Sequence, residues 1–166
     1  MTEQPERWIE PLAKAGVSIF SPHVETLNRD GFRVANEIAS IGGRLGLTLN
    51  PMTPLSEAEF LLHRVSLLTL MTVDVGFAGQ PFIEEMLPKI SEAVEFRDKE
   101  GLDYTIQIDG GCNKTTYKQL RDAGADMFIL GSSGLFRHAS DVAVAWGIMQ
   151  TEYEGATGEA LGRRDV

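Results

Sequence analysis

Cysteine is nearly absent from this sequence: Cys112 is the only one among 166 residues. A single cysteine excludes an internal disulfide and a cysteine-based zinc site, and it fits a reducing cytosol. Basic residues are also few, with 15 Lys and Arg against 24 Asp and Glu and a net charge of −9. This balance disfavours a nucleic-acid binder, which needs a basic face. A small anionic substrate stays open, because oriented backbone N–H groups can hold a phosphate.

Long apolar runs are absent as well. No run approaches the ~18 residues that a membrane-spanning helix needs. The first residues, MTEQPERWIEP, are polar and acidic, unlike a signal peptide. With 43% hydrophobic residues, the sequence predicts one soluble, cytoplasmic globular domain without membrane contact.

Short apolar runs rich in strand-forming residues recur along the chain. They predict strands at residues 17–20, 44–49, 66–73, 104–109 and 127–130. Segments with helical spacing separate them, so strand and helix alternate five times. This alternation is typical of βα units around a parallel sheet.

The helices are expected near residues 5–15, after Asn28–Asp30, from Pro88, after Asn113, and from Ser140 or Asp141. Periodicity predicts that these side chains face the core: Phe32, Ala35, Ile38, Ile90, Ala93, Val94, Tyr117, Leu120, Val142, Ala145, Trp146 and Met149. Trp8 is also expected to pack. Residues 151–166 contain few large apolar side chains, so we expect a domain over residues 1–150 and a polar C-terminal tail over 151–166.

Glycine-rich loops follow three consecutive predicted strands. Their sequences are DVGFAGQP at 74–81, DGGCN at 109–113 and GSSGLF at 131–136. Ligands of parallel α/β folds bind at the carboxyl ends of the strands. Glycine allows the backbone to approach a ligand closely. One glycine-rich loop is common in proteins without any binding role, whereas three such loops at neighbouring strand ends favour a phosphate site.

Asp109 is the sharpest candidate for chemistry, because it ends a buried strand directly before two glycines. Its position fits a metal ligand or a general acid/base, although an N-cap or Asx-turn residue is the commoner role of an Asp before Gly. His23 could face the same end of the sheet, although a structural role is favoured. The remaining candidates are interpreted as structural: His63 and His138 at the surface, Asp74 near a strand end, and Cys112 as a small loop residue without an activating neighbour.

Together these motifs resemble the ribulose-phosphate 3-epimerase family. The residues that carry the resemblance are SPHVETL, LTLNPMTPL, MTVDVGFAGQPFIEEMLPKI, IQIDGGCN and AGADMFILGSSGLF, in the family's order over roughly residues 1–150. The likeness is greatest to the branch that acts on allulose 6-phosphate. Two loop residues differ from many members: Val75 stands where proline is common, and Ala78 where glycine is common, the latter difference being shared by that branch.

The resemblance implies a (β/α)8 TIM barrel of the ribulose-phosphate-binding type and a phosphorylated ketose, ribulose 5-phosphate or allulose 6-phosphate. Two aspartates, one on each face of a planar ene-diolate, would invert C3. A divalent metal (Zn, Fe, Mn or Co) would stabilise the developing charge. Asp109 would be a metal ligand and one catalytic acid/base, with Met71 lining the pocket. The implied phosphate-side residues are Gly76, Phe77, Ala78, Gly79, Gly110, Gly111, Gly131, Ser132 and Ser133.

The family's first three strands have no counterpart in this sequence. They supply a serine, a His-x-Asp pair and a further histidine, and hence most of the metal ligands and the second aspartate. A complete barrel needs at least roughly 200 residues. We therefore expect an incomplete barrel of about five βα units, strands four to eight, and no epimerisation by this chain alone. The full-length protein could be a homo-oligomer.

Two alternatives remain at this point. One is a non-catalytic sugar-phosphate-binding remnant of the barrel. The other is a complete flavodoxin-like doubly wound sheet, which fits the length but expects a phosphate loop after the first strand, where SPHVETL has no glycine.

Overall fold

The computed structural model describes residues 1–27 and 29–162. Its five strands are β1 (Ile19–Phe20), β2 (Arg44–Leu49), β3 (Val65–Met71), β4 (Thr105–Asp109) and β5 (Met127–Ile129). All five predicted strands are confirmed, and β2 matches its predicted bounds. Predicted strand 17–20 is shorter than expected, because only its last two residues pair with a neighbour.

Helices separate the strands, five of them where they were predicted and a short sixth one, between β2 and β3, that was not. They are α1 (Glu6–Lys14), α2 (Gly31–Ser40), α3 (Glu59–Leu62), α4 (Met86–Lys99), α5 (Tyr117–Asp122) and α6 (Val142–Thr157). Short 3-10 turns lie at Val24–Thr26 and Leu55–Glu57, and a π-helical turn at Ser132–Phe136. The predicted cap Asp141 is confirmed: its carboxylate accepts from the N–H groups of Ala143 and Val144 at 2.8 and 3.0 Å. Asn28, named with the start of α2, lies outside the described residues.

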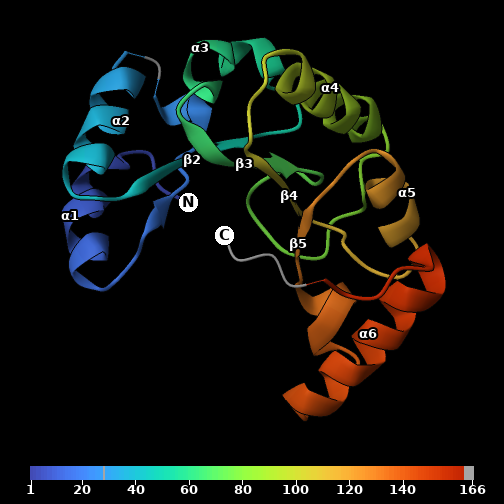
Figure 1. Cartoon of the computed structure of the whole chain (residues 1–166). Coiled ribbons are helices and arrows are strands. Elements are labelled where there is room, and N and C mark those ends of the chain that lie inside the picture. Colours follow the sequence, from blue (N-terminus) through green and yellow to red (C-terminus); the bar gives the residue numbers. More distant parts are fainter. Residues whose placement is uncertain (28, 163–166) are drawn as a thin grey trace.

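The sheet is parallel and its strands are neighbours in chain order, β1-β2-β3-β4-β5. Figure 1 shows the strands along the inner side of an arc and the helices along its outer side. A flavodoxin-like sheet would place one strand out of chain order and cover both faces with helices. The flavodoxin-like alternative is therefore wrong, and the successive βα units of a barrel-like fold are confirmed.

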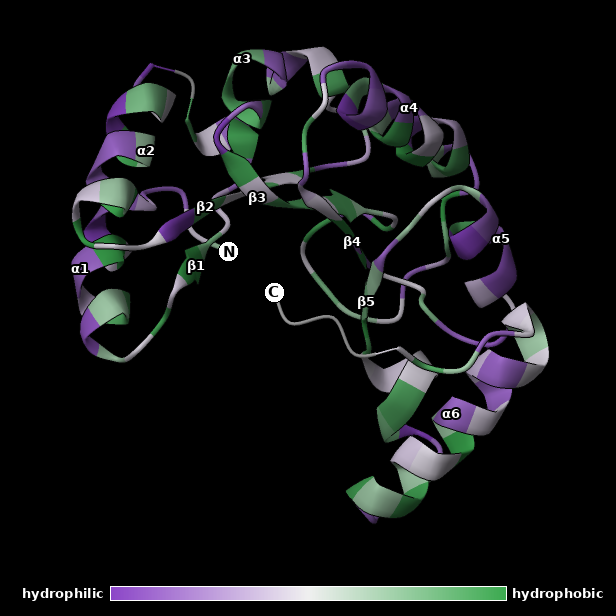
Figure 2. Cartoon of the chain, in the orientation of Figure 1, coloured by the Kyte–Doolittle hydropathy of each residue, from purple (hydrophilic) through white to green (hydrophobic). Residues whose placement is uncertain are grey.

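The two faces of the sheet differ in chemistry. Leu47, Leu68 and Ile106 lie side by side across β2, β3 and β4, and each is fully buried. One residue further along each strand, Thr69 Oγ1 donates to Gln107 Oε1 at 2.9 Å. Leu47, Leu68 and Ile106 belong to one buried cluster with helix residues such as Ile38 and Ile90. Figure 2 shows hydrophobic residues along β3 and on the helices around it. The hydrophobic effect thus fixes the sheet against its helical layer and leaves the inner face for other contacts.

Three predicted core residues are exposed instead. Phe32, Val142 and Trp146 are 48%, 59% and 41% exposed, and Trp8 is 53% exposed. The guanidinium of Arg64 covers Phe32 at 5.1 Å from the ring centre, so that ring packs under a cation and not in the core. Helical spacing locates an apolar side, but it does not say whether another element covers that side.

The tail predicted from Thr151 begins later, because α6 continues to Thr157. Tyr153 is buried, and its ring packs 5.4 Å from Tyr117 and 6.0 Å from Phe128. These aromatic contacts add burial that the local composition does not reveal. Gly158, at φ 73°, ends the helix in the left-handed conformation that favours glycine. Residues 163–166 of the predicted tail lie outside the described residues.

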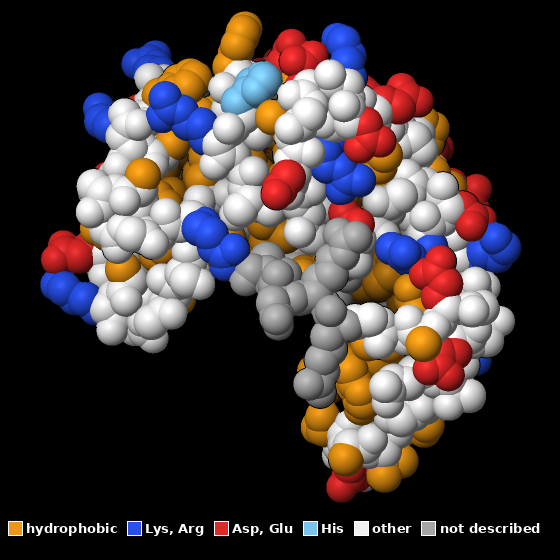
Figure 3. Space-filling model, viewed as in Figure 1, with side chains coloured by type: hydrophobic (Ala, Val, Ile, Leu, Met, Phe, Trp, Pro, Cys, Tyr) orange, Lys and Arg blue, Asp and Glu red, His pale blue; other side chains and the backbone are white. Residues whose placement is uncertain are grey.

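The molecule is hollowed on the inner side of the arc (Figure 3). Within the described residues, β1 and β5 each pair with one neighbouring strand, so the sheet has two open edges. Hydrophobic side chains are exposed near the edge formed by β5, including Ile129 at 40% and Phe136 at 60%. Open strand edges beside exposed apolar residues favour pairing with another chain and aggregation.

Candidate functional site

The loops that follow β3, β4 and β5 open into one hollow of about 560 Å³. All eleven residues that the sequence analysis singled out line it: Met71, Gly76, Phe77, Ala78, Gly79, Asp109, Gly110, Gly111, Gly131, Ser132 and Ser133. The parallel strands bring their carboxyl ends to the same edge, which joins segments far apart in the sequence. Asp74, Gln80 and Cys112 line the same hollow.

The loop after β3 is folded by Gln80. Its Nε2 donates to the carbonyl of Phe77 at 3.0 Å and also to the carbonyl of Asp74. Gly76 and Gly79 have φ values of 134° and 87°, which disfavour other residues. Phe77 is 72% exposed, so its ring stands at the rim. Gln80 is part of the motif DVGFAGQP, but its role could not be predicted from sequence, because it depends on carbonyls that only the folded loop presents.

The loop after β4 is held from both sides. Thr72 Oγ1 donates to the carbonyl of Gly110 at 2.6 Å, and Thr116 Oγ1 to that of Gly111 at 2.7 Å. Gly110 has φ 113°, and a Cβ there would lie 2.6 Å from Val73 Cγ2. The backbone at the DGG motif is therefore fixed, and only glycine fits at Gly110.

Cys112 belongs to the same loop and is buried. Burial, with the charge of Asp109, raises the pKa of its thiol to about 12. A thiol with this pKa stays protonated near neutral pH and is a poor nucleophile. The structure thus supports the interpretation of Cys112 as a loop residue.

The loop after β5 forms the π-helical turn Ser132–Phe136. The N–H groups of Leu135 and Phe136 donate back to the carbonyl of Gly131 at 3.0 and 3.3 Å. These bonds begin at Leu135, so the N–H groups of residues 132–134 precede the first bond of the turn. The turn packs on the preceding loop: a Cβ at Gly134 would lie 2.1 Å from the carbonyl oxygen of Cys112.

Asp109 lies between Met71 on β3 and Ile129 on β5, on the inner face of the sheet. Burial raises the pKa of its carboxyl, while the charge of His23 acts in the opposite direction. His23 is therefore close enough to act on Asp109, as its predicted place near this end of the sheet allows. A carboxylate whose pKa is raised by burial is suited to proton transfer.

This pKa gives a prediction for stability. The folded chain keeps the Asp109 proton at pH values where the unfolded chain, with an ordinary pKa of 3.8, has lost it. Stability from this group is therefore lost as pH rises from 3.8 through the folded pKa. In metal-free buffer, Asp109→Asn is expected to raise the melting temperature at pH 7 and to have little effect at pH 3. The exposed Asp103→Asn serves as control, and an equal or lower melting temperature of Asp109→Asn at pH 7 would contradict the prediction.

A second polar cluster follows β1 and β2. Glu25 Oε1 accepts from the N–H of Asn50 at 2.9 Å and from Thr53 Oγ1, and its Oε2 lies 3.4 Å from His23 Nδ1. Burial opposes ionisation, yet these hydrogen bonds keep the pKa of Glu25 below its ordinary value. Lys89 Nζ donates to the carbonyl of Asn50 at 2.8 Å. The sequence analysis missed this cluster, which fixes the loop that contains His23.

The metal implied by the resemblance finds no complete set of ligands here. Among the described residues, no three His, Cys, Asp or Glu side chains come together as a metal site. Asp109 lines the hollow, whereas His23 does not. The side chains that this part of the chain supplies therefore do not fit a divalent metal by themselves.

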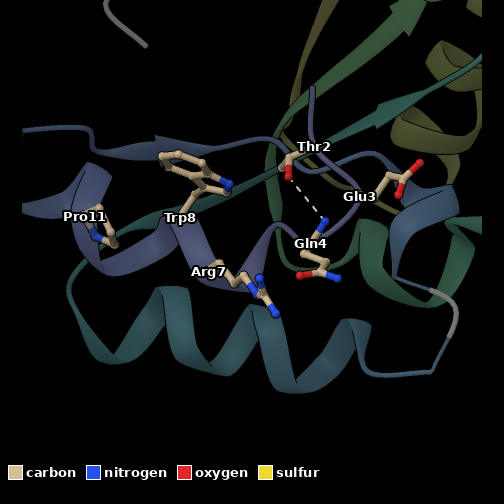
Figure 4. Close-up of a pocket in the computed structure, with 6 residues that line it drawn as sticks. All are labelled: Thr2, Glu3, Gln4, Arg7, Trp8 and Pro11. Atoms are coloured by element: carbon tan, nitrogen blue, oxygen red, sulfur yellow. Dashed lines mark hydrogen bonds between the residues drawn. The ribbon is translucent and has the colours of Figure 1, made fainter.

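The other candidates lie outside the hollow. His63 is exposed, as predicted, whereas His138 is only 16% exposed and contacts Glu152. A separate depression of about 420 Å³ lies on α1 beside Trp8 and Arg7 (Figure 4). It contains no residue of the motifs. No helix of the described residues is long and apolar enough to cross a membrane.

Comparison with known structures supports the fold. The native KDPGal structure superposes with a TM-score of 0.56 at 18% identity, over 92% of this chain and 63% of that chain. The 3-hexulose-6-phosphate synthase from Salmonella typhimurium gives a TM-score of 0.53 at 19% identity, over 90% and 68%. At this identity the likeness concerns the fold alone.

Comparison of sequences is more specific. Ribulose-phosphate 3-epimerases of Synechocystis sp. and Bacillus subtilis are each 40% identical over 134 residues, which is 80% of this chain and 58% and 61% of those proteins. The chloroplastic enzyme of Arabidopsis thaliana is 37% identical over 80% of this chain and 48% of its own. The chain thus spans about half to three fifths of the relatives that it matches. The model of the ribulose-phosphate 3 epimerase family matches residues 1–136, and the chain belongs to that family.

Proposed function

We propose that this chain provides the phosphate-binding side and one proton-transferring aspartate of a ketose-phosphate 3-epimerase, an isomerase of carbohydrate metabolism. One observation carries the proposal: all eleven motif residues line one hollow at the carboxyl ends of β3, β4 and β5. The substrate would be D-ribulose 5-phosphate, as the names of the relatives suggest, or D-allulose 6-phosphate.

The phosphate would bind between the loops after β4 and β5. Gly110 and Gly111 line the hollow together with Gly131, Ser132 and Ser133. Backbone N–H groups can hold an anion in spite of the chain's net charge of −9, because they act over hydrogen-bond distance. The loop after β3, with Gly76 to Gly79, would cover the ligand from the third side.

Asp109 would then face the ketose carbons and exchange a proton with C3. Inversion at C3 also needs a proton donor on the opposite face of the ene-diolate. Asp74 is the second carboxylate that lines the hollow, but it is exposed to solvent. The divalent metal of the resemblance would need ligands besides Asp109, so no step is assigned to it in this chain. Accordingly, we propose that residues 1–150 correspond to strands four to eight of the barrel.

For the 166-residue chain alone we expect binding without turnover. The sugar phosphate should bind through the two glycine-rich loops, whereas the exposed Asp74 is not expected to serve as the second proton-transferring carboxylate. Incubation with D-ribulose 5-phosphate or D-allulose 6-phosphate, followed by NMR of the sugar, measures any C3 epimer. Appearance of the epimer at a rate proportional to protein concentration would contradict this expectation.

The second candidate is a sugar-phosphate-binding protein without catalysis. It is favoured by the same lack of a complete metal site among the described residues. One experiment distinguishes the two candidate functions. A polypeptide with the first three barrel strands of a relative is added to the chain together with a divalent metal, and epimerisation is measured. Recovery of epimerisation supports the enzyme, and binding that stays unproductive supports the alternative.

A further inference from the structure

One carboxylate on α6 contacts both loops of the proposed phosphate site from outside the hollow. Lys114 Nζ, in the loop after β4, donates to Glu152 Oε1 at 3.2 Å. His138 Nε2, just past the π-helical turn after β5, lies 3.3 Å from Glu152 Oε2. The side chains of Glu152 and His138 are 19% and 16% exposed, so solvent screens this contact only in part.

The contact continues into the turn itself. His138 Nε2 also lies 3.1 Å from the carbonyl of Gly134, and Gly134 packs on the carbonyl of Cys112. Cys112 and Lys114 belong to one loop, so the contacts close a ring: Glu152, His138, Gly134, Cys112 and Lys114. A shift of either loop would break the ring at one of these contacts.

The carboxylate is held there at a cost. Glu152 Oε2 is buried and accepts no hydrogen bond, and the hydroxyl of the neighbouring Tyr117 is buried without a partner as well. Burial and the charges of Cys112 and Glu152 raise the pKa of Tyr117 to about 12. A buried carboxylate oxygen without a donor is unfavourable, and a negative charge behind an anion site opposes phosphate by Coulomb repulsion. Burial of Oε2 therefore acts against Glu152 at this position, and its contacts with Lys114 and His138 act for it.

We propose that Glu152 is a positioning residue that holds the two phosphate-side loops in register through Lys114 and His138. This inference rests on the proposed function, because it concerns the same phosphate site. Coulomb repulsion alone and the positioning role predict changes of opposite sign in phosphate affinity when the charge of Glu152 is removed. Simple electrostatics predicts tighter phosphate binding, whereas loss of positioning predicts weaker binding.

The test is Glu152→Gln in the full chain, titrated with inorganic phosphate by calorimetry. The control is Glu154→Gln, which removes an exposed carboxylate from the same helix. Glu152→Gln is expected to weaken phosphate binding about tenfold, and Glu154→Gln to leave it unchanged. A double-mutant cycle with Lys114→Gln, measured on phosphate affinity, should show that the two effects are coupled, as expected if the contact between them acts on the phosphate site.

Hydrogen exchange supplies a second measurement that does not depend on phosphate. The amides of residues 131–136 should exchange faster in Glu152→Gln than in Glu154→Gln. If Glu152→Gln does not fold, Lys114→Gln replaces it, because Lys114 is exposed, and the same amides should exchange faster in Lys114→Gln than in Glu154→Gln. Unchanged or tighter phosphate binding by Glu152→Gln, or unchanged exchange, overturns the inference. If the unaltered chain binds no phosphate, the proposed function fails, and the exchange rates alone decide the role of Glu152.

Discussion

Gly134→Ala is expected to lower the free energy of unfolding by about 3 kcal/mol and to abolish phosphate binding. An alanine Cβ would lie 2.1 Å from the carbonyl oxygen of Cys112 and 3.3 Å from Leu130 Cδ2. The first contact is with backbone, which cannot turn aside as a flexible side chain can. The two loops must separate, and the donors that line the hollow separate with them. Denaturant unfolding and calorimetry with inorganic phosphate measure the two effects.

Gly147→Ala is the matched control. Gly147 lies inside α6 and a Cβ there meets no atom within 4 Å. The same substitution should therefore stabilise the chain by about 0.5–1 kcal/mol, because alanine favours the helix. If Gly134→Ala and Gly147→Ala changed the free energy of unfolding in the same direction, the contact between the two loops would be contradicted.

Asp126→Ala is expected to destabilise the chain by about 3 kcal/mol. Asp126 Oδ2 accepts from Arg97 Nη1 at 2.7 Å and from the N–H of Ile106 at 3.0 Å. The two side chains of the ion pair are only 18% and 10% exposed. Removal of the carboxylate leaves a largely buried guanidinium with the carbonyl of Tyr104 at 3.1 Å and the exposed carboxylate of Asp98 at 3.6 Å as its remaining partners. The contact joins α4, β4 and the start of β5, and β4 ends at Asp109. Loss of this ion pair should therefore also loosen the strand that positions Asp109.

Asp122→Ala provides the comparison for a surface ion pair. Asp122 pairs with Lys118 at 2.8 Å, but the two side chains are 62% and 68% exposed. Solvent screens this pair, and its loss should change stability by at most about 0.5 kcal/mol. Thermal or denaturant unfolding of both variants measures the difference. Equal effects would show that the Arg97–Asp126 pair is not buried in solution.

The strands and the hollow could be predicted because their signals are local. Apolar runs bounded by glycines locate β2 and β4, and parallel pairing then brings Asp109 and Gly131 to one edge. The packed side of a helix depends on neighbours that periodicity does not contain, as Trp146 shows with 41% exposure. The end of α6 depends on the contact of Tyr153 with Tyr117, which are distant in sequence.

The residues that support the site were harder to find from sequence. Gln80 binds two carbonyls of its own loop, Glu25 bonds across to Asn50, and Glu152 contacts Lys114 and His138. Gln80 belongs to DVGFAGQP and Glu25 to SPHVETL, but the motifs assign no role to either side chain, and Glu152 lies outside the motifs. Each acts on a backbone group or a partner that only the folded chain brings near. Resemblance and strand-end position found the residues that line the hollow, and tertiary contacts revealed those that hold it.

The hollow after β3, β4 and β5 is expected to bind the phosphate of a sugar. The most direct test is an NMR titration of the isotope-labelled chain with inorganic phosphate, followed through its amide resonances. The amides of Gly110, Gly111, Gly131, Ser132 and Ser133 should shift together with one dissociation constant. Shifts confined to other residues, or no saturable shift in these five, would contradict the claim.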